Sequence, residues 1–251
     1  MGEGKVSSRK TIDFFLWKRP KAIDENNGNS YNKKEYYMAK CPDVHLREER
    51  NMNSTFDFLE ARWPDLALVG RSAELCRETD PKSCILKLAL LGELIEGYAI
   101  AYEQIEVPQD TDSSQWIQYL RQQKLLPGRA EEIMIALDKA GNEMILGAES
   151  SPEKAQTLLM LAYRLCGWFM GVYGEPGYVQ PEYTTVDPAL CENLEDTLAE
   201  LDEKITQLTI PTASELPEES QADRLVRSQE ICDKLSFTEE ELKLIDEISE
   251  A

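Results

Sequence analysis

Few side chains of this 251-residue sequence have the types and spacing that catalysis requires. Its single histidine, His45, lies in an irregular stretch that offers a catalytic pair no ordered scaffold. The six cysteines show neither CxxC spacing nor another recognisable zinc or redox pattern. They are Cys41, Cys76, Cys84, Cys166, Cys191 and Cys232. The sequence also lacks the GxxxxGK[ST] and GxGxxG phosphate-binding loops and the GxSxG nucleophile elbow. We therefore predict no catalytic residues, no metal and no cofactor, and a chain that is not an enzyme.

Two carboxylates interrupt an otherwise apolar stretch. Glu93 and Glu96 lie between Gly92 and Gly97, within a run of helically spaced apolar residues. One interpretation is a partly buried acidic site that faces a partner's arginine. The other is the narrow polar edge of a mostly buried helix, which is the commoner arrangement for such residues.

The dipeptide Gly141-Asn142 is the clearest local anomaly. It falls inside or at the end of a helical stretch, where glycine costs about 1 kcal/mol relative to alanine. A helix bend or a close contact between helices would explain it without any function.

Charge is the strongest compositional signal. With 27 basic and 47 acidic residues, the formal net charge is −20, and hydrophobic residues make up 42% of the chain. Residues 187–251 alone carry −14, whereas residues 1–50 carry +3. Such a surface repels polyanions, so we expect no direct binding of nucleic acid.

Cysteine use and hydropathy indicate a cytoplasmic protein. We find no secretory leader, and most cysteines lie among apolar helical residues, where a free thiol behaves as a small hydrophobe. The longest apolar run, around Ile85–Ile95, is interrupted by Lys87 and Glu93. We therefore expect no membrane span.

Helical spacing predicts an all-α fold. Residues 1–51 are polar and rich in Asn, Lys and Tyr, and we expect them to be disordered or an extension. Residues 52–175 read as a helical bundle domain, in which Asp80-Pro81 and Ser151-Pro152 are start signals that combine a capping side chain with proline. The apolar stripe that follows Asp80-Pro81 predicts a central buried helix.

The last part of the chain reads as separate helices joined by linkers. A linker at 176–188 precedes an amphipathic, coiled-coil-like helix at 189–210, whose apolar residues follow a 4-3-4-3 heptad spacing over about two repeats. These seam residues are Leu194, Leu198, Leu201, Ile205 and Leu208. Residues 211–251 form a linker and acidic helices, and Thr238 with Glu241 forms a capping-box pair for the last helix.

Several short motifs follow one another between Met52 and Tyr173. They are Phe56-Asp57-Phe58-Leu59 with Trp63-Pro64, Asp80-Pro81 through Leu88 with Glu93, Leu125-Leu126-Pro127, Lys139-Ala140-Gly141-Asn142-Glu143, and Leu161-Ala162-Tyr163-Arg164-Leu165 through Trp168-Phe169. In this order and spacing the chain resembles the helical domain at the N-terminus of type I restriction endonuclease R subunits and related DEAD-box helicase proteins. The resemblance implies a part in restriction of foreign DNA, in a chain that stops before the nuclease and helicase.

The same domain type is similar to HEPN helical domains, some of which are ribonucleases. In the ribonucleases of this type, the resemblance implies an arginine shortly before the Gly-Asn dipeptide and a histidine four residues after the asparagine. Asp138 and Leu146 stand at these places around Gly141 and Asn142, so the motif is degenerate. Neither residue supplies the cation and the proton-transfer group that RNA cleavage needs.

Three hypotheses follow from these features. The first is a non-catalytic, HEPN-like interaction or regulatory module of a type I restriction R-subunit-like protein. It would contact other domains or subunits, or itself, through its acidic surface and the seam. The second is a divergent HEPN ribonuclease. The third is a stand-alone adaptor or antitoxin-type protein.

Overall fold

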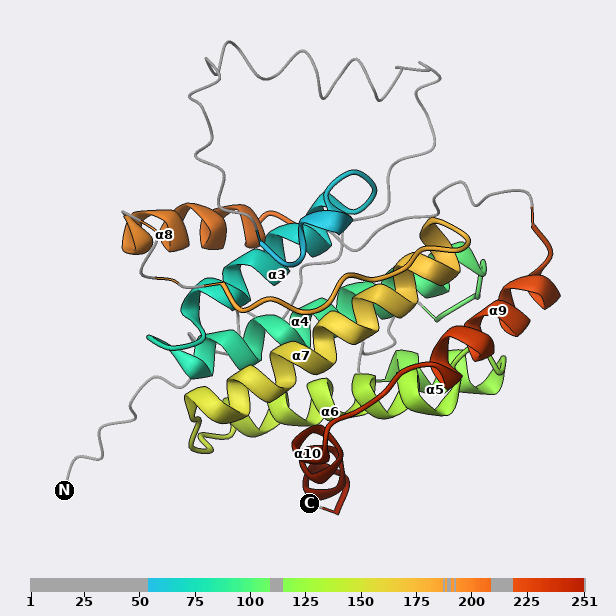
Figure 1. The fold of residues 1–251 in the computed structure, drawn as a ribbon. Helices are drawn as coiled ribbons and strands as arrows, with labels where there is room; N and C mark the ends of the chain where they lie inside the picture. The colour runs from blue at the N-terminus through green and yellow to red at the C-terminus, as the bar shows by residue number, and fades with distance from the viewer. Residues whose placement is uncertain are drawn as a thin grey trace, which may run out of the picture. The chain divides into compact units, whose positions relative to one another are not determined.

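All regular secondary structure that the structure describes is helical, which confirms the predicted all-α fold (Figure 1). The computed structural model describes residues 54–108, 115–186, 188, 191, 193–208 and 219–250. The segment 1–51, with His45 and Cys41, lies outside these residues. Within them, no helix combines the length and the apolar character that a membrane span requires.

The bundle is built from consecutive helices. A short 3-10 turn, η1 (Asp57–Leu59), precedes α3 (Pro64–Cys76), α4 (Pro81–Tyr102), α5 (Trp116–Gln122), α6 (Gly128–Ile145) and α7 (Pro152–Phe169). A single π-helical turn, η3 (Met170–Gly174), continues α7. Then follow α8 (Leu194–Ile205), α9 (Gln221–Asp233) and α10 (Glu239–Glu250).

The helix starts follow the capping side chains in the sequence. The Asp80 carboxylate accepts a hydrogen bond from the backbone N–H of Ser83 at 3.0 Å, and the Ser151 hydroxyl accepts one from Lys154 at 3.2 Å. In α10, Thr238 N donates to Glu241 Oε2 at 2.7 Å while Glu241 N donates to Thr238 Oγ1 at 3.2 Å. The predicted capping box is therefore confirmed, because each residue satisfies a backbone N–H of the other.

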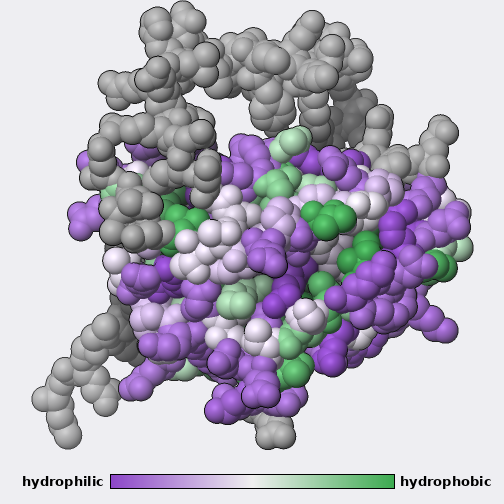
Figure 2. Space-filling view, viewed as in Figure 1, coloured by the Kyte–Doolittle hydropathy of each residue, from purple (hydrophilic) through white to green (hydrophobic). Residues whose placement is uncertain are grey.

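Helix α4 forms the centre of the bundle. It packs against α3, α6 and α7, and its residues Leu88, Leu91 and Ile95 are fully buried. On the face drawn in Figure 2, hydrophilic side chains predominate and apolar ones form scattered patches between them. The prediction of a central buried helix after Asp80 is confirmed.

The C-terminal half of the described chain packs on this bundle. Helix α8 lies along α3, α9 contacts η3 and α6, and α10 crosses α6 and α7 (Figure 1). The predicted linker contains residues without regular structure that run along α7. There, Tyr163 Oη donates to the Pro181 carbonyl at 2.9 Å and Gln180 Nε2 donates to the Tyr163 carbonyl at 2.6 Å. This extended segment is therefore held against the bundle.

Candidate functional site

Helices α4 and α6 approach each other closely beside the glycine of the Gly-Asn dipeptide. Gly141 lies inside α6, and a Cβ atom at this position would be 2.5 Å from the Cβ of Ala89 in α4. About one turn of α4 further on, an added Cβ at Gly92 would meet the Leu137 side chain at 3.5 Å. The glycine is thus explained by a close contact between helices, because no larger residue fits against Ala89 without displacing α4.

The acidic residues predicted on α4 meet a third carboxylate from α6. Glu96 is 4% exposed, and Glu93 and Asp138 are half-buried. Burial raises the pKa of Glu96 well above its ordinary value of 4.5, and the negative charges of Asp138 and Glu93 raise it further. The carboxyl group of Glu96 therefore holds a proton more tightly than an exposed glutamate does.

The degenerate HEPN-like residues do not share one side of α6: Gly141 faces α4, Asp138 is half-buried, and Asn142 and Leu146 are exposed. Asn142 is exposed, and its Nδ2 donates to Asp138 Oδ1 one turn earlier at 3.2 Å. Leu146 follows the last residue of α6 and is 87% exposed. Asp138 carries negative rather than positive charge, and Leu146 has no proton to exchange. The arrangement offers a surface for contact and no acid–base pair for cleavage.

The seam of α8 packs within the chain. Leu201 and Ile205 are buried, Leu194, Leu198 and Leu208 are half-buried, and the helix lies along α3. This corrects the expectation that the seam is available to another chain. The helix has the predicted amphipathic period, but about two heptads are too short for a coiled coil, and α3 covers the apolar stripe instead.

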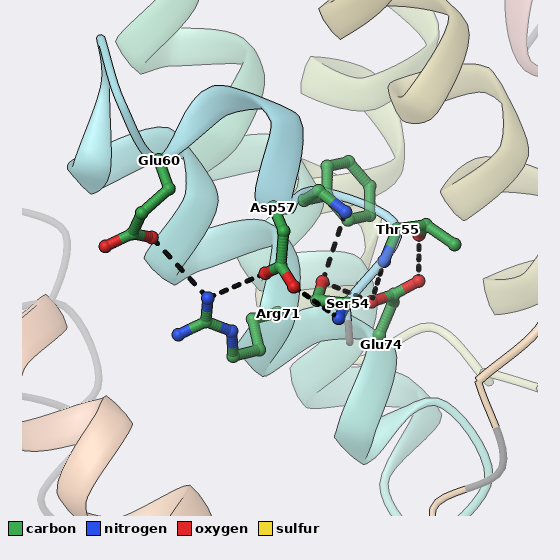
Figure 3. A network of polar contacts seen from close by, with 7 residues as sticks. Ser54, Thr55, Asp57, Glu60, Arg71 and Glu74 are labelled. Carbon is green, nitrogen blue, oxygen red and sulfur yellow. Dashed lines mark hydrogen bonds and ion pairs between the residues drawn. The ribbon is translucent and has the colours of Figure 1, made fainter. Parts of the chain in front are cut away.

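Glu74 is a buried carboxylate that the sequence did not indicate (Figure 3). It is 1% exposed and accepts hydrogen bonds from Ser54 Oγ at 2.5 Å, from Thr55 N at 3.2 Å and from the Thr55 hydroxyl. Burial raises the pKa of Glu74, while these hydrogen bonds lower it. Beside it, Arg71 bridges to Asp57 at 2.7 Å. The network is structural, because its bonds tie the segment before η1 to α3.

Sequence reasoning also missed the arginine contacts that hold the C-terminal helices. Arg164 of α7 donates to both carboxylate oxygens of Glu241, at 2.8 and 3.2 Å. Arg224 of α9 donates to both oxygens of Glu103 at 3.0 Å. Arg227 donates to the carbonyls of η3 at 3.0 and 2.7 Å, where the π-helical turn presents them to a side chain. No local signal identifies these pairs, since their members are far apart in the sequence.

Each arginine in the described ranges already has a partner within the chain. Every arginine in the described ranges donates to a carboxylate or a backbone carbonyl of this same chain. These residues are Arg62, Arg71, Arg77, Arg121, Arg129, Arg164, Arg224 and Arg227. A phosphate ligand would therefore have to compete with an existing partner at each of them.

Metal binding finds no support in this part of the chain. Among the described residues, no group of three or more His, Cys, Asp or Glu side chains could hold a metal ion. Comparison with known proteins adds no assignment, because no family model, curated protein or solved structure matches the chain. The functional argument therefore rests on the geometry of the α4–α6 site and on the charge of the surface.

Proposed function

We propose that the chain is a non-catalytic helical interaction module of a type I restriction R-subunit-like protein. It acts by contacts with other domains or subunits of a restriction complex. The restriction context comes from the resemblance of residues 52–173, and the non-catalytic role comes from the α6 residues. The two parts of the proposal can fail separately, and separate experiments test them.

The observation that carries the non-catalytic role is the pair of residues around Gly141-Asn142. A ribonuclease of the HEPN type needs a cation to stabilise the charge on phosphorus and a group that transfers a proton. Asp138 is anionic and accepts from Asn142, and Leu146 is aliphatic. Replacing a cation with an anion at such a site opposes phosphate binding as well as catalysis.

The C-terminal end of α6 supports a protein partner rather than a nucleic acid. Ile145 and Leu146 are 43% and 87% exposed and are among the most exposed large apolar side chains in the described residues. They lie at the end of α6, about two turns after Asp138, whose carboxylate accepts a hydrogen bond from Asn142. Exposed apolar groups beside a carboxylate fit a partner that offers an apolar patch flanked by lysine or arginine.

The non-catalytic role is tested by a cleavage assay. The purified 251-residue chain and its Asn142→Ala variant are incubated with structured and single-stranded RNA, and products are resolved on denaturing gels. We expect equal, background-level cleavage from both proteins. Cleavage by the wild-type chain that Asn142→Ala abolishes would establish the ribonuclease alternative.

The restriction context is tested by co-elution. The chain is co-expressed with the nuclease–helicase polypeptide encoded at the same locus, and complex formation is measured by size-exclusion chromatography with light scattering. We expect co-elution that Leu146→Glu weakens about tenfold or more, whereas Val179→Glu has no effect. Val179 is a matched control because it is 85% exposed and lies away from α6 on the extended segment. A wild-type chain that elutes alone would refute the restriction module.

A further inference from the structure

Two cysteines flank the corner between α3 and α4. Cys76 is the last residue of α3 and Cys84 lies in the first turn of α4, and their side chains are 2% and 0% exposed. The corner is tight, because Asp80 N donates to the Cys76 carbonyl at 2.7 Å and Cys84 N donates to the Asp80 carbonyl at 3.1 Å. The two cysteines therefore lie on either side of a short, hydrogen-bonded turn.

A lysine ammonium group faces the first of these thiols. Lys87 lies one turn after Cys84 on α4, and its Nζ donates to Cys76 Sγ at 3.8 Å. Cys84 lies one turn earlier on the same helix face, and its side chain interacts directly with that of Cys76. A positive charge next to a sulfur stabilises the thiolate, which is the reactive form of cysteine.

Helix α8 closes the corner from outside. The same Lys87 Nζ pairs with Asp202 Oδ1 of α8 at 2.9 Å, and Ser72 Oγ of α3 donates to that oxygen at 3.2 Å. The buried apolar anchors of α8 are Leu201 and Ile205. A short helix with two such anchors can lift from α3 at lower cost than a bundle helix, which gives a small oxidant access to Cys76.

The two thiols differ in acidity. The Cys84 thiol and the Lys87 ammonium lower the pKa of Cys76, against the opposing effects of burial and of Asp80 and Asp202. The pKa of Cys84 is raised well above its ordinary value by its interaction with Cys76 and by burial. Burial alone raises the pKa of Cys166, which is fully enclosed in α7. Cys76 is therefore suited to attack an oxidant, and Cys84 to resolve the product.

We propose that Cys76 and Cys84 form a redox-active dithiol that a hydroperoxide oxidises to an intramolecular disulfide. The Cys76 thiolate attacks the hydroperoxide, so that an S–O bond forms, the O–O bond breaks, and the departing alkoxide or hydroxide takes a proton. Cys84 then loses its proton and attacks the sulfur of Cys76, so that the S–S bond forms and water leaves. The two thiols supply the two electrons that reduce the peroxide.

Oxidation would change the contacts under α8. A disulfide sulfur carries no negative charge, so Lys87 loses one of its two partners and keeps only Asp202. The corner then joins α3 and α4 covalently, while the contact between α4 and α8 remains. This site stands apart from the α6 surface, so the inference does not depend on the proposed function.

The test uses the reduced 251-residue chain and hydrogen peroxide as the probe. After peroxide treatment, remaining thiols are blocked with iodoacetamide, and the protein is digested with trypsin without reduction and analysed by mass spectrometry. Trypsin cuts after Arg71, Arg77, Lys82 and Lys87, so a disulfide links the peptide 72–77 to the peptide 83–87. We expect this linked pair to form while Cys166 is recovered reduced. Recovery of Cys76 and Cys84 as blocked thiols to the same extent as Cys166 would overturn the proposal.

Variants of the neighbouring charges separate this chemistry from general exposure of thiols. We expect Lys87→Met to slow formation of the disulfide-linked pair about tenfold, as a tenfold smaller thiolate fraction would. This variant lacks the trypsin site at residue 87, so its Cys84 is followed in the peptide 83–121. Asp202→Asn should accelerate it, because the variant frees Lys87 for Cys76 and loosens α8. The control is Lys82→Met, which removes an exposed lysine from the first turn of the same helix and should leave the rate unchanged. In this control Cys84 is followed in the peptide 78–87, because the trypsin site at residue 82 is lost. Oxidation of Lys87→Met at the wild-type rate would contradict the assigned role of the lysine.

Discussion

Replacing Arg224 with methionine removes the charged group that holds α9 against the end of α4. In the folded chain, Arg224 Nε and Nη2 each lie 3.0 Å from an oxygen of Glu103. The two side chains are only 9% and 2% exposed. The variant keeps most of the aliphatic stem, so the change acts mainly on the charge. It leaves the Glu103 carboxylate buried without its countercharge.

The expected loss is large because the remaining charge stays buried. Removing one partner of a buried pair typically costs roughly 3–5 kcal/mol, which is a large part of the roughly 5–15 kcal/mol that stabilises a domain. Gln221 Nε2 still donates to Glu103 at 3.0 Å, so we expect a loss near the lower end, about 3 kcal/mol. The exposed pair Lys243–Glu247, with side chains 77% and 60% exposed, provides the contrast. Its loss in Lys243→Met should cost about 0.5 kcal/mol or less.

Urea unfolding and hydrogen exchange measure these losses. Unfolding is followed by circular dichroism and by tryptophan fluorescence, which reports α9 because Trp168 Nε1 donates to Ser228 of that helix at 3.1 Å. Hydrogen exchange shows whether protection is lost in α9 alone or throughout the bundle. The double variant Arg224→Met with Glu103→Leu should recover most of the loss, since it removes the stranded charge. If Arg224→Met lowers the free energy of unfolding no more than Lys243→Met does, the contact between Arg224 and Glu103 does not act as a buried ion pair.

Three further substitutions probe other contacts. Glu241→Ala removes the capping box and the bidentate contact with α7, at about 1 kcal/mol for the cap and about 1.5–3 kcal/mol for the charged hydrogen bonds; hydrogen exchange should show loss of protection confined to α10. Gly141→Ala places a Cβ 2.5 Å from that of Ala89, so urea unfolding should show a loss of about 1–3 kcal/mol, which Ala89→Gly restores in the double variant. Glu96→Gln should raise stability at about pH 7 and give no gain near about pH 4. Folding raises the pKa of Glu96, so the ionised carboxylate destabilises the folded state. The wild-type chain regains this stability as pH falls through the folded pKa. A gain that is equal at both pH values would show that charge is not the cause.

Local capping chemistry made the helix starts predictable. Asp80, Ser151 and Thr238 each bond to a backbone or side-chain group three residues later, and the sequence displays that spacing directly. The apolar stripe of α4 was equally visible, because it repeats with the helical period. Features that depend on a few consecutive residues were therefore open to prediction.

The sequence does not predict which residues pair when they are far apart in the chain. Arg164 and Glu241 are 77 positions apart, and Arg224 and Glu103 are 121 apart. In an acidic chain each arginine has many candidate partners, and only the packing of the bundle selects one. The acidic site shows the same division. Glu96 stood out in the sequence as a carboxylate in an apolar helix, but the third carboxylate comes from α6 and no local pattern points to it.

The arginine contacts also explain how the most acidic part of the chain folds against a bundle of the same sign. Residues 187–251 have a net charge of −14 and residues 51–186 a net charge of −9, so the two parts of the chain repel each other electrostatically. Contacts such as Arg164–Glu241 place a positive charge at the interface, where the low local dielectric makes the attraction strong. Salt screens exposed charges far more than buried pairs. Raising salt from low concentration to about 0.3 M should therefore increase hydrogen-exchange protection in α9 and α10, because the surface repulsion is screened while the clamps remain. Salt-induced loss of that protection would mean that surface attraction, and not the buried arginines, holds these helices.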